Sequence, residues 1–340
     1  KDAAEYSDIL MNNFVQCKEI HKIIEITDKT TSGIDEVKMS LTGGLFAGVS
    51  KDKFDAPQRL HTKDLSNKHS NLFSFCVWLV GITDSDGGFS IEKSGENKYV
   101  WVYFVDQHLY NIRLLIYIKK VLGVGNINDS GQNMRKYRIR DRKILKEIII
   151  PIFNQLPLLT SKMYKYKLWV EALEIWESDL SKEDRVKRVI EIKERMTHIP
   201  SDYKSSAYHI TVNLKEFYNP NWVGGFVEGD GSFYITKKGI DRYVPTFGIT
   251  QKLDKHILSD LKEILHISSE IKIRKNHNIL ETSSNRSIQN IIKYFKNNLI
   301  SNKNIEYKIF AKYVYYNRKS DSKKAMHYRN LLKKFRKIKE

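Results

Sequence analysis

Cysteine and long apolar runs are scarce in this chain of 340 residues. Its two cysteines, Cys17 and Cys76, are too few and too far apart for a disulfide framework or a structural zinc site. The longest apolar run, residues 73–82, is interrupted by Ser74 and Gly81 and is too short to cross a membrane. We therefore expect a soluble protein of a reducing compartment, with no membrane partner, that is long enough to fold around its own cores.

Acidic residues are few relative to basic ones. The chain carries 58 Lys and Arg against 40 Asp and Glu, a formal net charge of +18 at pH 7. Residues 318–340 alone hold ten basic residues and two acids. A merely soluble basic surface is the plain interpretation, but such an excess predicts an acidic polymer as partner. We favour nucleic acid over an anionic membrane because aromatic residues are spread through both halves.

The first part of the chain shows little regular patterning. Residues 1–70 are predicted to form an N-terminal extension, and the glycine-rich segment 42–48 is predicted to be a plain loop because it lacks the Lys-Ser/Thr ending of a phosphate-binding loop. Since the chain begins at Lys1 and not at Met, we expect a fragment or a processed product, in which a targeting signal is neither read nor excluded.

An apolar run that ends in two acids and glycine occurs twice. The first copy is LVGITDSDG at residues 79–87, and the second is VGGFVEGDG at residues 223–231. Their last acids, Asp86 and Asp230, lie 144 positions apart. The same offset separates Gln107 from Gln251, and Lys162 and Lys303 follow at an offset of 141. An offset that recurs at several separate points predicts a duplicated domain.

Each half shows the same predicted order of helix, strand, strand, helix, strand, strand and helix. In the first half these are residues 72–84, 89–93, 99–105, 109–121, 124–128, 136–139 and 142–153, with two further helices after Pro157. The second half begins again at Pro220 with strands 232–237 and 243–251, helix 255–265, strands 271–274 and 278–281, and helix 286–295. We predict repeat 1 over residues 71–200, a linker over 201–218, and repeat 2 over 219–340 with a basic C-terminal tail.

The glycines of the two copies allow their helices to cross closely, so that the acids at the helix ends converge. Two carboxylates brought together repel each other, and a shared hard cation such as Mg²⁺ relieves the repulsion. Metal ions held by few carboxylates and completed by phosphate oxygens promote phosphodiester hydrolysis. The paired acids therefore indicate nuclease chemistry.

The motif has two other interpretations. An Asp-Gly pair after a helix is also a common turn, but a second copy at a matched position in a basic protein favours a metal site. A calcium-binding loop is disfavoured because residues 84–87 lack the third acid before the glycine and the Glu at the twelfth position.

These residues resemble the paired motifs of single-chain LAGLIDADG homing endonucleases and intron maturases, of the mitochondrial intron-encoded type. The similarity extends over residues 78–89, 122–125, 137–142, 157–162, 219–234 and 247–254. The resemblance implies an α+β fold of two αββαββα repeats with pseudo-twofold symmetry, whose two antiparallel sheets form a saddle on double-stranded DNA.

The resemblance also implies roles for the matched pairs. Asp86 and Asp230 match the catalytic acids that bind divalent metal, Mg²⁺ or Mn²⁺. Gln107 and Gln251 match polar residues that position water, and Lys162 and Lys303 match lysines beside the scissile phosphates, although a solvated helix start is the alternative for both lysines. The motifs depart from the family pattern at Thr83, which fills an apolar position, and at Glu228, which replaces the first Asp.

On the saddle, every second residue of each first strand is expected to face DNA. Counting evenly from the acids gives Ser90, Glu92, Ser94, Tyr234, Thr236 and Lys238. Because the two sets differ in chemistry, an asymmetric target is expected.

The leading functional hypothesis is a monomeric, site-specific DNA endonuclease. The alternative is a maturase that binds and folds group I intron RNA, with splicing cofactors as partners, and a third hypothesis is a non-catalytic component of a larger ribonucleoprotein. The absence of an initiator Met is expected if the protein is translated from an intron reading frame in continuity with the upstream exon and is then cut from the longer product, as in the family that the chain resembles. Abundant Ile, Lys and Asn are typical of an AT-rich organelle genome and favour the mitochondrion over the plastid.

Overall fold

The computed structural model describes residues 65–200, 203, 218–316 and 321–337. The predicted loop at residues 42–48, most of the predicted N-terminal extension and most of the predicted linker lie outside these ranges. Within them, no helix is long and apolar enough to cross a membrane.

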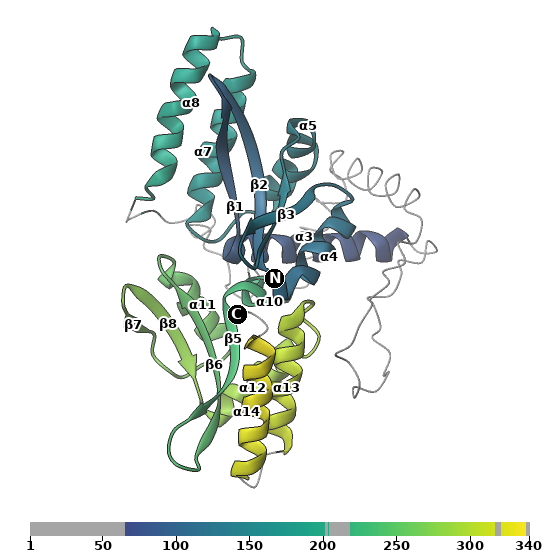
Figure 1. The fold of residues 1–340 in the computed structure, drawn as a ribbon, viewed down its shortest axis with the longest axis vertical. Helices are drawn as coiled ribbons and strands as arrows, with labels where there is room; N and C mark the ends of the chain where they lie inside the picture. The colour runs from purple at the N-terminus through teal and green to yellow at the C-terminus, as the bar shows by residue number, and fades with distance from the viewer. Residues whose placement is uncertain (1–64, 201–202, 204–217, 317–320, 338–340) are drawn as a thin grey trace, which may run out of the picture.

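The first half is a four-stranded sheet with its covering helices, drawn in blue and teal in the upper part of Figure 1. Its α-helices are α3 (Leu65–Asp86), α4 (Ile112–Leu122), α5 (Arg142–Ile144), α6 (Ile150–Gln155), α7 (Lys162–Glu177) and α8 (Lys182–Thr197). Its strands are β1 (Gly87–Gly95), β2 (Lys98–His108), β3 (Asn126–Gly131) and β4 (Met134–Ile139). The 3-10 turn η1 (Leu109–Asn111) precedes α4, and the π-helical turn η2 (Leu145–Ile149) joins α5 to α6.

The second half, in green and yellow below it, repeats this layout. Its helices are α10 (Pro220–Asp230), α11 (Lys255–Ile264), α12 (Asn285–Phe295), α13 (Asn302–Tyr316) and α14 (Ser322–Lys337). Its strands are β5 (Gly231–Lys237), β6 (Tyr243–Gln251), β7 (Lys272–Arg274) and β8 (His277–Thr282).

The two sheets share one topology and one register. Their antiparallel orders are β1-β2-β4-β3 and β5-β6-β8-β7. Phe89 pairs with Tyr103 in the first sheet, and Phe233 pairs with Phe247 at the matching positions of the second. The predicted α+β class and the duplicated order of elements are therefore confirmed.

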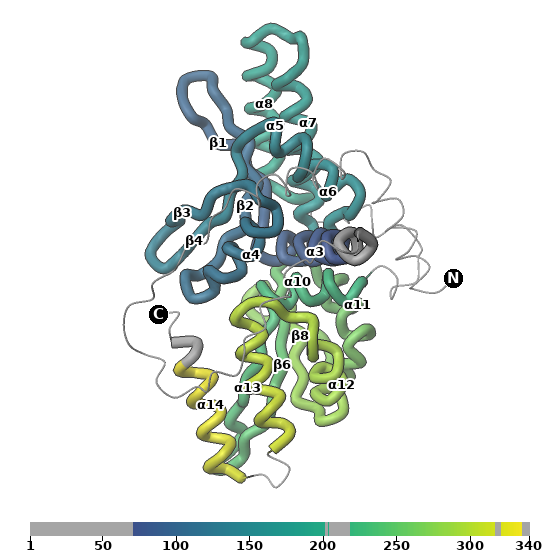
Figure 2. Tube along the Cα trace, turned by 90° about the vertical axis from the view of Figure 1, so that its right-hand side faces the viewer, coloured from purple at the N-terminus to yellow at the C-terminus, as the bar shows by residue number. Residues whose placement is uncertain are grey.

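Helices α3 and α10 pack against each other at the centre of the molecule and join the two halves (Figures 1 and 2). A Cβ atom on Gly81 would lie 2.1 Å from the carbonyl oxygen of Trp222, and one on Gly225 would lie 2.2 Å from that of Trp78. The two contacts are equivalent, because Gly225 lies 144 positions after Gly81 and Trp222 lies 144 positions after Trp78. Only glycine permits main chains to approach this closely, so the crossing depends on these two positions.

One face of each sheet is buried beneath helices. Along β1 the side chains of Phe89 and Ile91 are buried and the intervening ones are partly exposed, as strand alternation requires. Phe89 packs on Trp169 of α7, and Phe233 packs on Phe310 of α13 at a similar distance. The apolar side of each sheet therefore carries its core, and the polar side stays accessible.

Two segments differ from the sequence-based prediction. The helix predicted over residues 142–153 is interrupted by η2 just before Pro151, which has no N–H to continue an α-helical ladder. The predicted basic tail is for the most part the helix α14, in which Ala325 and Leu332 are buried against Ile235 of β5. The seven-residue spacing of these two apolar residues indicates a helix that buries one face, but the many basic residues around them favoured the prediction of a tail.

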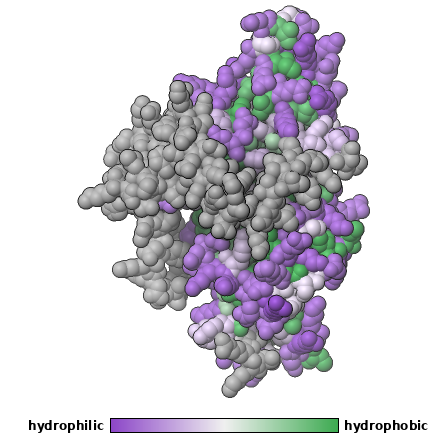
Figure 3. Space-filling model, turned by 180° about the vertical axis from the view of Figure 1, so that it is seen from behind, coloured by the Kyte–Doolittle hydropathy of each residue, from purple (hydrophilic) through white to green (hydrophobic). Residues whose placement is uncertain are grey.

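On the face seen in Figure 3, hydrophilic residues cover most of the described surface and hydrophobic patches are small. The most exposed large aliphatic side chains of the described residues, Ile240, Ile273 and Leu253, belong to separate elements or loops of the second half. Such single exposed residues do not mark a binding site by themselves.

Candidate active site

The predicted catalytic acids end the two crossing helices. Asp86 is the last residue of α3, and Asp230 is the last residue of α10. A Cβ atom on Gly229 would stand 2.7 Å from Oδ2 of Asp86 and 2.3 Å from Oγ of Ser85. Because Gly229 immediately precedes Asp230, the crossing brings both carboxyl groups to one place, and glycine at 229 leaves room for the first of them.

The surroundings make both carboxyl groups hard to ionise. Burial, followed by the negative charge of Asp86, raises the pKa of Asp230 to about 7, and the positive charge of Lys162 opposes that rise. Burial also raises the pKa of Asp86, opposed by Lys162 and by the hydrogen bond from Gln107. Two desolvated acids with mutual repulsion are a place where a bound cation lowers the electrostatic energy.

Each acid is held by the glutamine predicted from the repeat. Gln107 Nε2 donates to Asp86 Oδ2 at 2.6 Å, and Gln251 Nε2 donates to Asp230 Oδ2. In the first half, Asn111 Nδ2 also donates to Gln107 Oε1 at 2.9 Å, which orients the amide. Sequence reasoning missed Asn111, because the residue 144 positions later is Lys255 and the repeat gives no signal for it.

Lys162 begins α7 and reaches into the end of α3. Its Nζ donates to the carbonyl oxygens of Thr83 at 3.0 Å, Ser85 at 2.6 Å and Gly87 at 2.8 Å. Burial lowers the pKa of this lysine, and the charge of Asp86 opposes the shift. The ammonium is thus fixed beside the acids with all three N–H groups engaged, which is unlike a solvated helix start.

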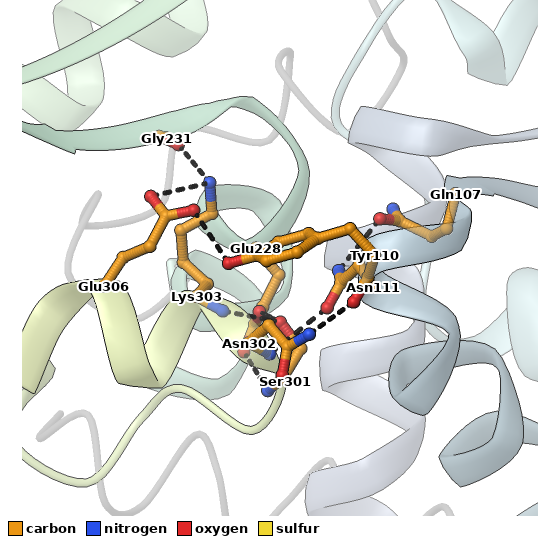
Figure 4. A network of polar contacts seen from close by, with 9 residues as sticks. All are labelled: Gln107, Tyr110, Asn111, Glu228, Gly231, Ser301, Asn302, Lys303 and Glu306. Atoms are coloured by element: carbon orange, nitrogen blue, oxygen red, sulfur yellow. Dashed lines mark hydrogen bonds and ion pairs between the residues drawn. The ribbon is translucent and has the colours of Figure 1, made fainter. Parts of the chain in front are cut away.

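Lys303 occupies the matching position at the start of α13 and is also buried. Its Nζ donates to the carbonyl oxygen of Gly231 at 2.8 Å and lies 3.9 Å from Oε2 of Glu306 (Figure 4). The Glu306 carboxylate in turn accepts a hydrogen bond from the hydroxyl of Tyr110, at 3.2 Å, across the two halves. The corresponding positions of the other half hold residues of a different type, Asp254 for Tyr110 and Lys165 for Glu306, so comparison of the repeats did not reveal this pair.

The first acids of the two motifs both accept hydrogen bonds from main-chain N–H groups. Asp84 is buried and accepts hydrogen bonds from the N–H groups of Leu159 and Thr160 and from Trp222 Nε1, at 2.9–3.1 Å. Burial raises its pKa to about 6, against the lowering effect of these donors. Glu228 accepts in the same way from the N–H groups of Ile300 and Ser301.

The departures noted in the two motifs therefore have structural explanations. Glu228 substitutes for Asp as a main-chain acceptor, and the loop that it holds carries Lys303. The hydroxyl of Thr83 donates to the Leu79 carbonyl at 2.7 Å and lies 2.9 Å from the hydroxyl of Tyr103, so this polar group is satisfied in the core.

Two contacts fasten the lysine-bearing loops to the opposite half. Ser161 N and Oγ donate to the two carboxylate oxygens of Asp254, at 2.7 and 2.9 Å. On the other side, Asn302 N donates to Asn111 Oδ1 at 3.1 Å, and Asn302 Nδ2 donates to the Tyr110 carbonyl (Figure 4). Each lysine is thus placed by a loop that depends on both repeats.

A polar cavity of about 190 Å³ opens beside Asp86. Its lining includes Asp86, Gln107, Tyr110, Asn111, Glu228 and Lys303. The cavity therefore lies between the two halves and adjoins one predicted member of each pair.

The structure places the residues predicted to face DNA on the accessible side of each first strand, with two exceptions. Ser90, Glu92, Tyr234 and Thr236 alternate with buried residues as predicted. Ser94 instead lies where the β1–β2 register shifts, and Lys238 follows the end of β5. Even counting fails at both points because the strands end or bulge there.

Three of the residues predicted to face DNA already form side-chain contacts within the protein. Glu92 forms an ion pair with Arg140, and the Tyr234 hydroxyl donates to Glu281 at 2.5 Å. Thr236 shares a hydrogen bond of 2.8 Å with Thr246. The partners Arg140 and Glu281 extend the polar surface beyond the first strands.

The donor set at the helix ends suits a hard cation. Among the described residues no cluster of three or more His, Cys, Asp or Glu is placed to hold a metal. Asp86 and Asp230 supply oxygen donors, the type that Mg²⁺ and Ca²⁺ prefer, and Mg²⁺ is usually held by one or two carboxylates with water and phosphate oxygens completing its shell. The residues present therefore fit a metal shared with a phosphate-containing substrate.

Comparison with known proteins agrees with this geometry. The chain is 37% identical over 259 residues to the "Probable intron-encoded endonuclease Cox1-I1b" of Schizosaccharomyces pombe, covering 73% of this chain and 66% of that protein. It is 30% identical over 210 residues to the "Uncharacterized mitochondrial protein RF1" of Saccharomyces cerevisiae, covering 59% of this chain and 41% of that one. The chain thus spans under two thirds of the length of these relatives.

A solved structure shares the fold. I-SmaMI, described as bound to an uncleaved DNA target in the presence of calcium ions, superposes with a TM-score of 0.66 at 22% identity, covering 76% of this chain and 97% of that one. The family described as LAGLIDADG endonuclease matches residues 79–173 and 223–314, which include both motifs, both glutamines and both lysines. The chain belongs to the LAGLIDADG endonuclease family.

Proposed function

We propose that this protein is an intron-encoded, site-specific endonuclease that hydrolyses both strands of duplex DNA with a divalent metal ion. The observation that carries the proposal is the meeting of Asp86 and Asp230 at the ends of two crossing helices, each beside a glutamine and a lysine. The names of the relatives and the DNA-bound structure of I-SmaMI support the same activity.

Each half supplies one set of groups for one strand. Asp86 and Asp230 would hold Mg²⁺ or Mn²⁺, which supplies charge stabilisation at the scissile phosphate and lowers the pKa of bound water. Gln107 and Gln251 orient the carboxylates, and through them any water that the acids contact. Lys162 and Lys303 add positive charge where negative charge develops on the phosphate.

The saddle surfaces would carry target recognition. Ser90 and Glu92 of β1 differ in charge and size from Tyr234 and Thr236 of β5, so the two halves read different base sequences. A single chain with two unlike halves needs no second copy, so we propose that it acts as a monomer. We propose the mitochondrion as its site of action, which the relative named as a mitochondrial protein supports.

The proposed activity is tested with duplex DNA that carries the intronless exon junction. With Mg²⁺ the protein is expected to produce a double-strand break, whereas Asp86→Asn or Asp230→Asn abolishes cutting and leaves binding in a gel-shift assay within a few fold. Undiminished cleavage by the double variant would overturn the proposal. The matched control is Lys120→Gln, which removes the charge of an exposed side chain on α4.

A second function, binding and folding of group I intron RNA, is favoured by α14. This helix contains seven Lys and Arg and no acid, whereas its counterpart α8 mixes both signs. It packs on the Ile235 side of β5, opposite the face that carries Tyr234 and Thr236. DNA seated on the saddle would leave α14 uncovered, so its basic surface is available to a second polyanion.

Replacing exposed Lys323, Lys333 and Lys334 with Ser separates the two functions. We expect weaker and less salt-dependent binding of the host intron RNA, with the slope of log affinity against log salt reduced by roughly 0.7 per lost phosphate contact, and unchanged DNA cleavage. Equal RNA affinity before and after the change would remove α14 from this role. The matched control replaces exposed Lys182, Lys187 and Arg188 of α8.

A further inference from the structure

The two halves hold their active-site lysines in chemically different ways. Lys162 Nζ donates to three main-chain carbonyl oxygens and so has every N–H group engaged. Lys303 Nζ donates to one carbonyl oxygen in the described part of the chain, that of Gly231, and has a carboxylate 3.9 Å away. Lys303 thus combines one main-chain contact with a nearby carboxylate, whereas Lys162 is held by main-chain carbonyl groups at the end of α3.

That neighbour is specific to the second half. Glu306 lies one turn after Lys303 on α13 and is fully buried, with 0% of its surface exposed. The residue at the corresponding position of α7, three after Lys162, is the partly exposed Lys165. The two half-sites therefore differ by a reversal of charge at a position next to the catalytic lysine.

The Glu306 side chain is held from the first half of the protein. Tyr110 belongs to η1 of repeat 1, and its hydroxyl donates to Glu306 Oε1 at 3.2 Å, while Oε2 faces Lys303 (Figure 4). The main chain of Tyr110 also accepts a hydrogen bond from Asn302, the residue before Lys303. The first repeat thus sets the position of the lysine in the second repeat through two contacts on one residue.

We propose that Glu306 is a positioning residue for Lys303 and makes the cleavage of one DNA strand dependent on the Tyr110–Glu306–Lys303 contact. This inference rests on the proposed endonuclease function. At 3.9 Å the carboxylate acts on the ammonium by charge and not through a hydrogen bond. Without that charge, the buried ammonium keeps its contact with the Gly231 carbonyl and the more general field of Asp86, Glu228 and Asp230, but loses the carboxylate 3.9 Å away, so its position relative to the scissile phosphate changes.

The two DNA strands should therefore differ in how fast they are cut when Glu306 is changed. Lys162 has Lys165 at the position that corresponds to Glu306, and it keeps its three carbonyl contacts when Glu306 changes. Loss of the Glu306 charge is therefore expected to slow the cut made by the Lys303 half-site and to spare the other, so that nicked duplex accumulates.

The experiment follows both strands of one target duplex, each labelled with its own fluorophore, under single-turnover conditions with Mg²⁺. Glu306→Gln keeps the size of the side chain and an acceptor for Tyr110 but removes the charge. We expect it to slow the cleavage of one DNA strand by up to about a hundredfold, the loss that a displacement of about an ångström can cause. The affected strand should be the one that Lys303→Met slows, and Tyr110→Phe should slow the same strand by less.

Lys165→Gln is the matched control, because it removes a charge at the corresponding position of the other half and should leave the strand ratio of the unaltered protein. Equal slowing of both strands by Glu306→Gln would reveal a folding defect and overturn the proposal, as would an unchanged strand ratio. Absence of cleavage by the unaltered protein would instead overturn the proposed function, and this inference with it.

Discussion

Gly81 on α3 lies against the main chain of Trp222 on α10, so closely that a Cβ atom would stand 2.1 Å from the carbonyl oxygen. Gly81→Ala must therefore push the two helices apart, which we expect to destabilise the fold by about 2 kcal/mol or more, since overpacking typically costs about 1–3 kcal/mol. The same displacement separates Asp86 from Asp230, so cleavage should fall further than the loss of folded protein explains.

Chemical denaturation with a cleavage assay on the folded fraction checks this prediction. Gly239→Ala is the control, because the nearest atom to its added Cβ is 3.7 Å away, and its effect should stay within about 0.5 kcal/mol. A Gly81→Ala protein as stable as the control would show that the crossing has more room than the structure indicates.

The two crossing tryptophans provide a second, internally controlled test. Trp222 Nε1 donates to the buried carboxylate of Asp84 at 2.9 Å, whereas Trp78 Nε1 is buried with no partner among the described residues. Trp222→Phe and Trp78→Phe remove similar volume, but only the first removes a hydrogen bond to a charged group. We expect Trp222→Phe to lower the free energy of unfolding by about 1.5–3 kcal/mol more than Trp78→Phe. Equal losses would contradict the assigned role of Asp84.

The two acids of the first motif should respond differently to the same change. Asp84→Asn places an amide N–H group among main-chain donors and should destabilise the protein by about 3 kcal/mol or more. Asp86→Asn should change stability little, or even raise it, because it removes a desolvated carboxylate beside Asp230, yet it should abolish cutting. Thermal melts and cleavage assays on both variants distinguish an anchoring acid from a catalytic one.

The raised pKa of Asp230, about 7, gives the metal-free protein a pH-dependent stability. In the folded state this carboxyl keeps its proton until about pH 7, while in the unfolded state it ionises near its ordinary value of 3.8. The stabilising contribution is therefore present below the unfolded pKa and is lost as pH rises through about 7. The melting temperature of metal-free protein should fall over that interval, and the fall should be smaller in Asp230→Asn.

Added divalent metal should offset this loss, because it binds the ionised carboxylates and stabilises the folded state by mass action. Melting curves at several pH values with and without Mg²⁺ measure the effect. A melting temperature of the unaltered protein that rises through pH 7 without metal would contradict the assigned pKa.

The constant offset between the repeats predicted many structural features of this protein because it identifies the residues that both halves share. The crossing helices, the sheet order, and the acid, glutamine and lysine pairs all recur at 144 or 141 positions. The offset gives no signal for a residue whose type differs between the two halves. Asn111, which orients Gln107, and Glu306, which faces Lys303, have lysines at the corresponding positions of the other repeat, so no pattern marked them.

The sequence by itself determined the duplication, the α+β class and the two carboxylates at the helix ends, because local periodicity and a constant offset are written along the chain. Tertiary structure alone decided that Lys162 is held by three carbonyls and Lys303 by one carbonyl and Glu306, that Asp84 anchors a loop instead of facing the site, and that α14 packs on the back of its sheet. Burial, charge pairing and hydrogen-bond partners depend on which distant segments meet, and the meeting of α3 with α10 sets those contacts.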